Sequence, residues 1–242
     1  MKDLMFKFFH ESTKIKKIGT PTSSVDWPPE WKIVEFKSYP RLQQITLPKP
    51  EDANISLSQS IINRQSERNF SKKPVNLQQL SNLLFYSAGI TKKESLGYDN
   101  GRRAYPSGGA RYPLEIYLAV FEGKDIKEGI YHYNVKNHGL EELLKGNYRQ
   151  EFLGAVGQDM VKESSFLLLI SAVFNRTIAK YKDRGYRLIL LEAGHLGQNI
   201  SLVSTALNLK SCALGGFLDD KCSEILDIEK DNESVIYIFA CG

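Results

Sequence analysis

The stretch from 165 to 173 is short and almost entirely apolar, and it constrains the fold more than any other segment. Such a run is typical of a β-strand that is covered on both faces. Residues 235–239, Val-Ile-Tyr-Ile-Phe, repeat the pattern near the C-terminus. A sheet that is buried on both faces requires helices on each side of it. The sequence therefore predicts an α+β layer architecture around a central sheet.

A long amphipathic helix, from about 187 to 209, is the strongest candidate for one of these covers. Its apolar residues recur in steps of three and four along one helical face. Shorter helices are predicted over 56–63 and between a cap at Asn76 and a stop at Gly89. Residues 114–121 and 130–135 are rich in β-branched and aromatic side chains, so we expect neighbouring strands there.

The first fifty residues differ in composition from the rest of the chain. They contain six of the nine prolines and both tryptophans, Trp27 and Trp31. Because proline fixes φ and removes a backbone donor, we expect an extended arm that wraps over a surface, without regular helices or central strands. Its aromatic side chains are expected to anchor it. The predicted domains are therefore this arm, residues 1–50, and one globular domain, residues 51–242.

Composition excludes several classes of protein. The chain has 242 residues, of which 42% are hydrophobic and 25% charged, and its formal net charge is +4. Such a chain can bury a sizeable core, which excludes a disordered or membrane-spanning protein. The longest stretch without Asp, Glu, Lys or Arg, 193–209, is interrupted by polar residues that a bilayer disfavours. Basic residues come in separated pairs, so we expect neither a membrane nor a nucleic-acid partner.

Cysteine and histidine usage narrows the location and the chemistry. The three cysteines are an odd number without C-x-x-C spacing, and charges at positions 2, 3 and 7 interrupt the N-terminus where a signal peptide would be apolar. We therefore expect a cytoplasmic protein. The four histidines have no i, i+4 partner, so no metal site is expected. Local signatures of P-loop ATPases, Rossmann enzymes, zinc proteases and α/β-hydrolases are absent.

Two features are hard to explain by packing alone. The first is residues 64–70, Arg-Gln-Ser-Glu-Arg-Asn-Phe, which place two guanidinium groups and a hydroxyl close together. Such groups suit a phosphate or a polarised carbonyl. A solvated helix end, with Glu67 paired locally, explains them equally well. Both interpretations stay open at this point.

The second feature is a set of glycine pairs. Gly108 and Gly109 lie in a Pro-Gly-rich loop at 105–113, and Gly215 and Gly216 follow the short strand candidate after the long helix. Consecutive glycines let a planar ligand approach the backbone and leave amides free to donate. A simple turn that leads into a strand is the alternative. The recurrence of such sites favours a ligand.

Four segments of the chain share an order and spacing with a known family. They are Arg-x-Ser-x-Arg-x-Phe (64–70), Pro-Ser-Gly-Gly-Ala-Arg-x-Pro (106–113), Leu-Glu-Ala-Gly-His-Leu-Gly-Gln-Asn (191–199) and Gly-Gly-Phe (215–217). In these segments the chain resembles the SagB-type azoline dehydrogenases of the FMN-dependent nitroreductase superfamily. The arm contributes as well, because residues 10–14 are similar to a His-Glu-x-Thr-Lys signature. The likeness thus covers nearly the whole chain.

The resemblance implies a nitroreductase-like three-layer sandwich with a mostly antiparallel sheet, a homodimer formed through the long helices, and FMN at the subunit interface. It implies that Arg64 holds the FMN phosphate, Ser66 the polar tail, and Arg68 the N1/O2 edge of the flavin. A cation there stabilises the negative charge that hydride transfer to N5 leaves behind. The implied contacts to the flavin ring are, from the other subunit, Pro106, Ser107, Gly108 and Gly109, and, as backbone amides toward N5, Gly215 and Gly216.

One departure concerns the phosphate. Many nitroreductases add basic residues near the C-terminus, whereas this chain ends Phe-Ala-Cys-Gly. Phosphate binding would therefore need a further cation beside Arg64. His195 and Gln198 are weaker candidates for facing the cofactor, because a polar residue on a buried interface helix can simply satisfy a backbone group.

The catalytic residues implied by the resemblance are Lys180 and Tyr181, a Lys-Tyr pair that precedes Arg-Gly-Tyr-Arg at 184–187. Oxidation of a thiazoline or oxazoline to an azole requires loss of the α-proton to a base and of a β-hydride to the flavin. Lysine and tyrosine have ordinary pKa values near ~10.4 and ~10, so the pKa of one must be lowered for it to act as a base near neutrality. The sequence does not decide which. A surface Lys-Tyr pair on an amphipathic helix is the structural alternative.

The predicted function is an FMN-dependent dehydrogenase that oxidises azolines in ribosomally made peptides, with a cyclodehydratase complex and the precursor peptide as partners. One alternative is an NAD(P)H-dependent nitro- or quinone reductase of the same fold, in which Lys180 and Tyr181 are dispensable. Another is a flavin-poor scaffold subunit of a peptide-modifying complex.

Overall fold

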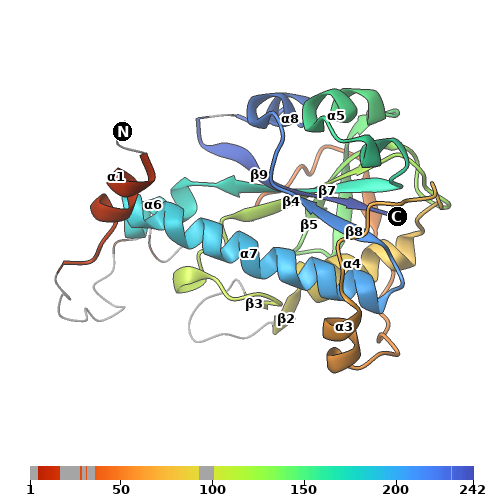
Figure 1. Cartoon of the computed structure of the whole chain (residues 1–242), viewed down its shortest axis with the longest axis horizontal. Coiled ribbons are helices and arrows are strands. Elements are labelled where there is room, and N and C mark those ends of the chain that lie inside the picture. The colour runs from red at the N-terminus through yellow and green to blue at the C-terminus, as the bar shows by residue number, and fades with distance from the viewer. Residues whose placement is uncertain (1–4, 17–27, 29–30, 32–35, 93–100, 230) are drawn as a thin grey trace.

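The apolar run at 165–173 forms an interior strand, β7 (Phe166–Val173), of a seven-stranded sheet. The computed structural model describes residues 5–16, 28, 31, 36–92, 101–229 and 231–242. Among these, every strand pair of the large sheet is antiparallel, in the order β1-β6-β5-β4-β7-β9-β8. The predicted central sheet is therefore confirmed (Figure 1).

Seven strands build the large sheet, and two short ones pair beside it. The strands of the large sheet are β1 (Gln44–Thr46), β4 (Leu114–Val120), β5 (Gly129–Asn134), β6 (Gly139–Lys145), β7, β8 (Ser211–Leu214) and β9 (Glu233–Cys241). The small sheet consists of β2 (Ile90–Lys92) and β3 (Arg102–Arg103). The segments at 114–121 and 130–135 became the neighbours β4 and β5, as predicted.

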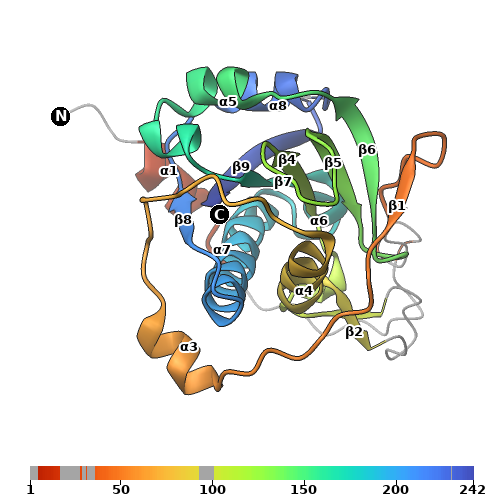
Figure 2. The same cartoon turned by 90° about the vertical axis from the view of Figure 1, so that its right-hand side faces the viewer.

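Helices cover both faces of the large sheet, so the chain forms the predicted three-layer α+β sandwich (Figure 2). The helices α4 (Leu77–Ala88) and α7 (Asp183–Ala206) lie on one face, and α5 (Arg149–Val156) and α8 (Asp219–Ile225) lie on the other. The remaining helical segments are α1 (Met5–Ser12), α3 (Leu57–Asn63), α6 (Asn175–Tyr181), and the 3-10 turns η2 (Gly108–Ala110) and η3 (Asp159–Lys162).

The alternation of side chains along β7 explains why both faces need a cover. Leu168 and Ile170 pack into the core on the α4 and α7 side, whereas Leu167 and Leu169 pack into the core on the α5 and α8 side. All four side chains are fully buried. Burying a leucine or isoleucine side chain contributes roughly 1.5–3 kcal/mol. A polar residue at any of these four positions would therefore destabilise one of the two cores.

Local capping signals set the boundaries of the shorter helices. The Asn76 side chain accepts the Gln79 amide and the Gln79 side chain accepts the Asn76 amide, which closes a capping box at the start of α4. Gly89 ends that helix, as predicted. Ser56 and Gln59 form the same reciprocal pair at the start of α3. These two helices are confirmed close to their predicted bounds.

The arm is partly helical, and the prediction that it lacks regular helices is wrong for α1. All six prolines of the arm follow position 20, so residues 5–12 keep every backbone donor that a helix needs. Two other expectations for the arm are met among its described residues: an aromatic side chain anchors it, and its strand is not a central one. Trp31 Nε1 donates to the Ala179 carbonyl at 3.3 Å, and β1 joins the sheet only at its edge. Trp27 lies outside the described residues, and the domain boundary at residue 50 stays a prediction.

Candidate functional site

The predicted catalytic pair lies at a break between two helices. Lys180 and Tyr181 are the last residues of α6, and Lys182, with φ of 48°, separates α6 from α7. The long helix therefore begins at Asp183, four residues before the predicted start at 187. The break therefore places the pair at the C-terminal end of α6, outside the long helix.

The glycine-rich loop at 106–109 meets this pair within one chain. Gly109 has φ of 64°, in the left-handed region that favours glycine. A Cβ at this position would overlap the Tyr181 hydroxyl and lie 3.4 Å from Lys180 Nζ. Gly109 thus allows the backbone to approach both predicted catalytic groups. Pro106, the first residue of the loop, is exposed.

The arm and the same loop enclose the pair further. Arg111 donates through Nε to the Arg176 carbonyl at 2.5 Å and through Nη1 to the Trp31 carbonyl at 2.7 Å. Lys180 Nζ lies 5.5 Å from the centre of the Trp31 ring. Partial burial and the nearby Arg111 charge lower the pKa of Lys180. The surroundings of this lysine therefore favour its neutral form more than water does.

Sequence reasoning missed a buried carboxyl behind the loop. The Ser107 hydroxyl donates to Glu192 Oε2 at 2.7 Å and accepts the Tyr112 amide at 2.8 Å. The Ser107 side chain is thus engaged inside the protein, and its backbone carbonyl accepts the Ala110 amide at 3.1 Å. Burial raises the pKa of Glu192 to about 7. Its position on the apolar stripe, between Ile189 and Leu196, was the signal that could have identified it.

A second group of buried charges fixes α6 on the sheet. Arg176 Nη1 lies 2.5 Å from Glu115 Oε1, and it also donates to the Tyr112 carbonyl. His132 lies between Glu115 and Glu141, at 3.0 and 2.8 Å. Burial opposes ionisation of Glu115, but the His132 hydrogen bond and the Arg176 charge lower its pKa to about 2. The ion pair therefore persists over the physiological pH range and holds the helix that carries Lys180.

The arginine run is displayed on the surface. Arg64 caps the C-terminus of α3 and is half-buried, whereas Ser66 and Arg68 are exposed. Two hydrogen bonds attach this segment to the start of β8 and to the residue before it. The Glu67 amide donates to the carbonyl of Ser211, the first residue of β8, at 3.0 Å, and Lys210 Nζ donates to the Asn69 carbonyl at 2.5 Å. Lys210 is a cation beside the arginine run that the sequence analysis did not identify.

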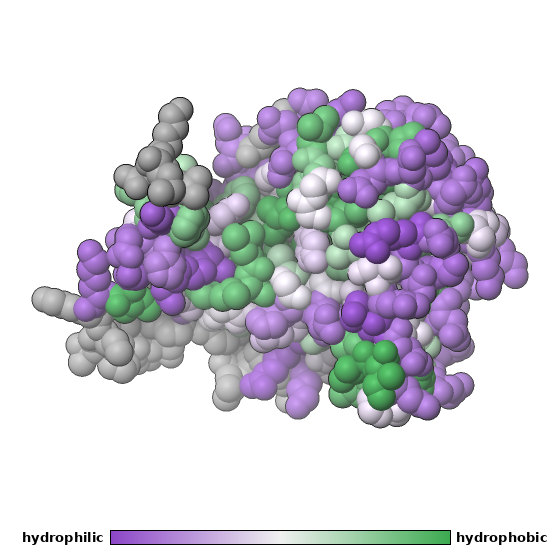
Figure 3. Space-filling view, in the orientation of Figure 1, coloured by the Kyte–Doolittle hydropathy of each residue, from purple (hydrophilic) through white to green (hydrophobic). Residues whose placement is uncertain are grey.

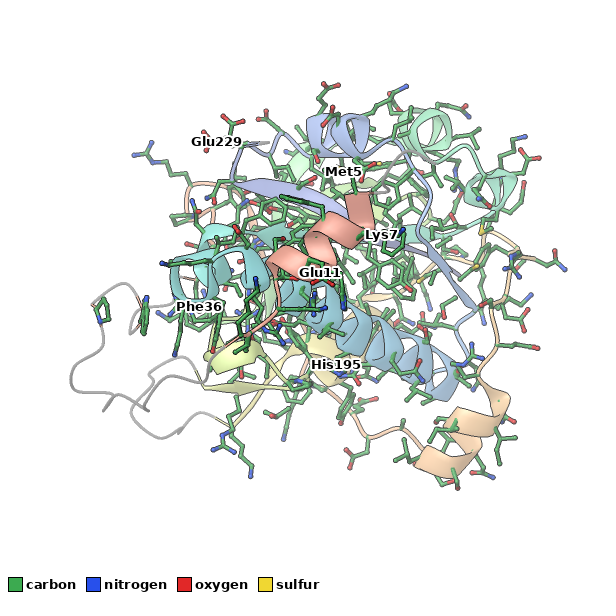
Figure 4. All side chains as sticks on the ribbon, turned by 60° about the vertical axis from the view of Figure 1, so that its left-hand side comes forward. Met5, Lys7, Glu11, Phe36, His195 and Glu229 are labelled. Atoms are coloured by element: carbon green, nitrogen blue, oxygen red, sulfur yellow. The ribbon has the colours of Figure 1, made fainter. Side chains whose placement is uncertain are left out.

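Gly215 and Gly216 lie between β8 and α8 and are exposed. A Cβ at either position would meet no atom of the described residues within 4 Å. His195, which Figure 4 labels, and Gln198 are exposed on α7. The space over this part of the chain is therefore open to a ligand or to another subunit.

One chain does not bring all predicted site residues together. The pair at 180–181 and the 106–109 loop lie at the N-terminal end of α7, whereas the arginine run lies toward its C-terminal end (Figure 1). A helix of 24 residues is about 36 Å long. Within one chain, the two groups of predicted site residues therefore lie toward opposite ends of a long helix.

A separate cavity of about 610 Å³ lies beside the N-terminal end of α6 and is lined there by Asn175 and Arg176. Its lining includes Phe36 and Glu229, which Figure 4 labels, together with Lys37 and Glu233. Lys37 Nζ and Glu233 Oε2 form an ion pair at 2.5 Å. No residue predicted for the site lines this cavity.

None of the helices in the described part of the chain combines the length and the apolarity that a membrane crossing needs.

Comparison with known proteins identifies the family. The nitroreductase family model matches residues 61–242. A relative from Methanocaldococcus jannaschii, whose name assigns it to the nitroreductases, is 35% identical over 188 residues, which are 77% of this chain and 91% of the relative. The microcin B17-processing protein McbC of Escherichia coli is 28% identical over 189 residues, which are 71% of this chain and 68% of McbC.

Solved structures agree with this assignment. A nitroreductase-like protein from Anabaena variabilis superposes with a TM-score of 0.75 at 27% identity, over 97% of this chain and 45% of that longer chain. A chain of the E. coli microcin synthetase McbBCD complex, solved with truncated pro-MccB17 bound, superposes with a TM-score of 0.64 at 22% identity, over 98% of this chain and 91% of that one. The second likeness supports the fold. By the family match and by these relatives, the chain belongs to the nitroreductase family, as its sequence motifs predicted.

Proposed function

We propose that this protein is an FMN-dependent dehydrogenase that oxidises azolines to azoles in ribosomally made peptides. The observation that carries the proposal is the position of Lys180 and Tyr181 against Gly109, at the break between α6 and α7. A reductase that only passes electrons through a flavin has no need for such a pair. The relative McbC, which is named for processing microcin B17, supports a peptide substrate.

The residues of the chain fit FMN. The guanidinium groups of the half-buried Arg64 and the exposed Arg68 suit a phosphate and an anionic ring edge, and Lys210 would be the further cation for the phosphate. Gly215 and Gly216 present backbone that no side chain covers. When bound, FMN supplies a two-electron acceptor for the oxidation.

The chain itself supplies the base. Aromatisation of an azoline releases a proton from the α-carbon, and two electrons leave with a hydride from the β-carbon. The lowered pKa of Lys180 favours a neutral amine, which can take the α-proton. Tyr181, whose hydroxyl lies against Gly109, is the second candidate for this role. Trp31 packs against Lys180 and limits the access of water to it.

A homodimer would complete the site. Exposed apolar side chains lie on α7, at Leu190 and Leu191, and on α3, at Ile61 and Ile62. Figure 3 shows the apolar surface over α3. A second copy packed on this face would bury these side chains. We propose that each site combines the arginine run of one subunit with the 106–109 loop and the Lys-Tyr pair of the other.

Further partners are proposed from the relatives. The E. coli McbBCD structure is an assembly that holds a truncated precursor, pro-MccB17. By analogy, we propose that this chain works beside a cyclodehydratase that forms the azolines on a precursor peptide. An NAD(P)H-dependent nitro- or quinone reductase is the second candidate function, and the name of the M. jannaschii relative favours it.

The test is to replace Lys180 by Ala and Tyr181 by Phe in the flavin-loaded protein and to measure azoline oxidation and NAD(P)H-dependent nitro reduction. We expect each variant to lose at least about 100-fold in azoline turnover, the typical effect of removing a general base. FMN content should not change. Lys73→Ala, an exposed lysine outside the predicted site, is the control and should keep full turnover.

Two outcomes would contradict the proposal. Unchanged azoline turnover in the variants with retained flavin would remove the Lys-Tyr mechanism. A colourless protein that cannot be reconstituted with FMN would favour the scaffold alternative.

A further inference from the structure

We propose that Glu192 is a positioning residue for this reaction: by accepting the Ser107 hydroxyl, it holds the 106–109 loop against Lys180 and Tyr181. The catalytic part of this inference rests on the proposed function, whereas its structural part does not. Glu192 is linked to the two predicted catalytic side chains through Ser107 and through the loop that contains Gly109. Its effect on them would pass through the loop.

The contacts form a short chain from α7 to the loop. Glu192 is 3% exposed and lies on the buried face of α7. Its Oε2 accepts the Ser107 hydroxyl at 2.7 Å, and the Ser107 oxygen in turn accepts the Tyr112 amide at 2.8 Å. The turn between Ser107 and Tyr112 is thus fixed from one carboxylate. Gly109, which touches Tyr181, lies inside this turn.

Packing does not explain a carboxyl at this position. Its neighbours on the stripe, Ile189 and Leu196, are fully buried apolar residues, and a leucine at 192 would continue the pattern. The second oxygen, Oε1, is buried and has no hydrogen-bond partner in the part of the chain that the structure describes. A buried carboxylate with one unsatisfied oxygen destabilises the fold. A leucine at this position would lack the hydrogen bond to Ser107 that the carboxylate makes.

The charge on Glu192 changes near neutral pH, which makes the role testable. The groups that face it are Arg103 on β3 and Tyr105 in the following segment, and Glu115 on β4 interacts with both of these. Burial raises the pKa of Glu192 to about 7, although the Ser107 hydroxyl, the Arg103 charge and the Gly108 backbone amide oppose the shift. The ionised carboxylate accepts a hydrogen bond from the Ser107 hydroxyl. After protonation, that hydroxyl no longer has a charged acceptor, so the loop is held less firmly below pH 7.

The structural test is hydrogen exchange of the peptide that spans 107–112, measured between pH 6 and 8.5 and corrected for intrinsic exchange. We expect Glu192→Gln and Ser107→Ala each to speed exchange about tenfold at pH 8, and the double variant to show no further increase, because both remove one charge-assisted bond. Ser204→Ala is the matched control, since Ser204 is a buried polar residue on the same helix. It should leave the 107–112 peptide unchanged. Exchange in Glu192→Gln equal to that of the wild type, or additive effects in the double variant, would overturn the inference.

The catalytic readout separates this inference from the proposed function. With an azoline substrate, kcat of the wild type should rise with pH through about 7, and that rise should be absent in Glu192→Gln while KM and FMN content stay the same. If the wild type shows no azoline oxidation but the exchange effects are present, the proposed function fails and the structural role of Glu192 stands. If azoline oxidation occurs and Glu192→Gln keeps the wild-type pH profile, the function stands and the positioning role fails.

Discussion

The two ends of α7 are built in different ways. At its N-terminal end, the Lys-Tyr pair is surrounded by contacts within one chain, from Arg111, Arg176 and the 106–109 loop. At its C-terminal end, the side chains of Arg64 and Arg68 make no recorded bond to another segment in the described part of the chain. The first end is organised before any ligand arrives. The second end is exposed and open to a ligand or to a second copy of the chain.

The largest expected effect tests the organised end. Gly109→Ala would place a methyl group against the Tyr181 hydroxyl at φ of 64°. We expect azoline turnover to fall by at least about 100-fold, because small misplacements of catalytic groups have effects of this size. Turnover of the purified, flavin-loaded variant is the measurement.

Gly157→Ala is the matched control. Gly157 has almost the same backbone angle, φ of 66°, but a Cβ there would meet no atom of the described residues within 4 Å. Both variants therefore carry the same strain of about 1–2 kcal/mol, and only Gly109→Ala adds the contact with Tyr181. Equal activities of the two variants would show that the loop does not position the pair.

The next effect concerns the stability of the same end. The pKa of Glu192 rises from 4.5 in the unfolded chain to about 7 in the folded protein, so folding favours the protonated form. The associated stability is complete below pH 4.5, is lost as the pH rises toward 7, and is absent above it. Such a change in pKa corresponds to up to roughly 3 kcal/mol. Glu192→Gln, which cannot ionise, should therefore be more stable than the wild type at pH 8.

Urea unfolding at pH 8 and at pH 5 measures this difference. The gain in the free energy of unfolding should be largest at pH 8 and should shrink at pH 5. A variant that is less stable than the wild type at pH 8 would mean that the Ser107 bond outweighs the burial of the charge. In that case, the ionised Glu192 would stabilise the fold through Ser107 and would not lower the free energy of unfolding.

The organised end also shows what the sequence could not reveal. The two motifs at 10–14 and 184–187 were each identified from the sequence, but their contact was not. Arg184 Nη1 donates to the Thr13 carbonyl at 2.7 Å, and Arg187 donates to the Thr13 hydroxyl. A sequence pattern states which side chains exist, but not which distant segments meet.

Local signals, by contrast, predicted element boundaries well. Helix α4 was predicted from its cap to its stop because Asn76, Gln79 and Gly89 act on their own neighbours. Strand β6 was not identified, because its Gly-Leu-Glu-Glu-Leu-Leu-Lys sequence lacks the alternation of a strand. This segment forms a strand because it pairs with β5 and β1 and because Glu141 makes a buried contact with His132. These are long-range causes that no local window contains.

A smaller effect is expected at the open end of α7. Arg64→Ala and Lys210→Ala should each weaken FMN binding about tenfold, because a charge-assisted bond to phosphate contributes roughly 1.5–3 kcal/mol. Both cations are accessible to solvent, so the affinity of the wild type should also fall as salt is raised. Flavin fluorescence titration of the apoprotein measures both effects.

Arg41→Ala, an exposed arginine of the arm, is the control for these variants and should keep the wild-type affinity for FMN. Unfolding of Arg64→Ala should match that of the wild type, since no long-range side-chain contact of Arg64 is recorded in the described residues, whereas Lys210→Ala also loses the bond to the Asn69 carbonyl. If Arg64→Ala and Lys210→Ala bind FMN as tightly as the wild type, the open end does not hold the phosphate. The two ends of α7 would then not form a composite site.

The smallest effect tests how the arm is attached to the organised end. Thr13→Val keeps the volume of the side chain but removes the hydroxyl that donates to the Phe9 carbonyl and accepts a hydrogen bond from Arg187. Because Thr13 is 2% exposed, Arg187 would lose this partner without water to replace it. We expect a local loss of about 1 kcal/mol, seen as several-fold faster hydrogen exchange in α1 with little change in global unfolding. Ser12→Ala removes an exposed hydroxyl whose recorded bond among the described residues is to the same Phe9 carbonyl, so it should leave α1 unchanged. Equal exchange in both variants would mean that the apolar contact of Phe9 with Tyr186, at 5.8 Å between ring centres, and not the threonine, holds the arm on the Arg-Gly-Tyr-Arg segment.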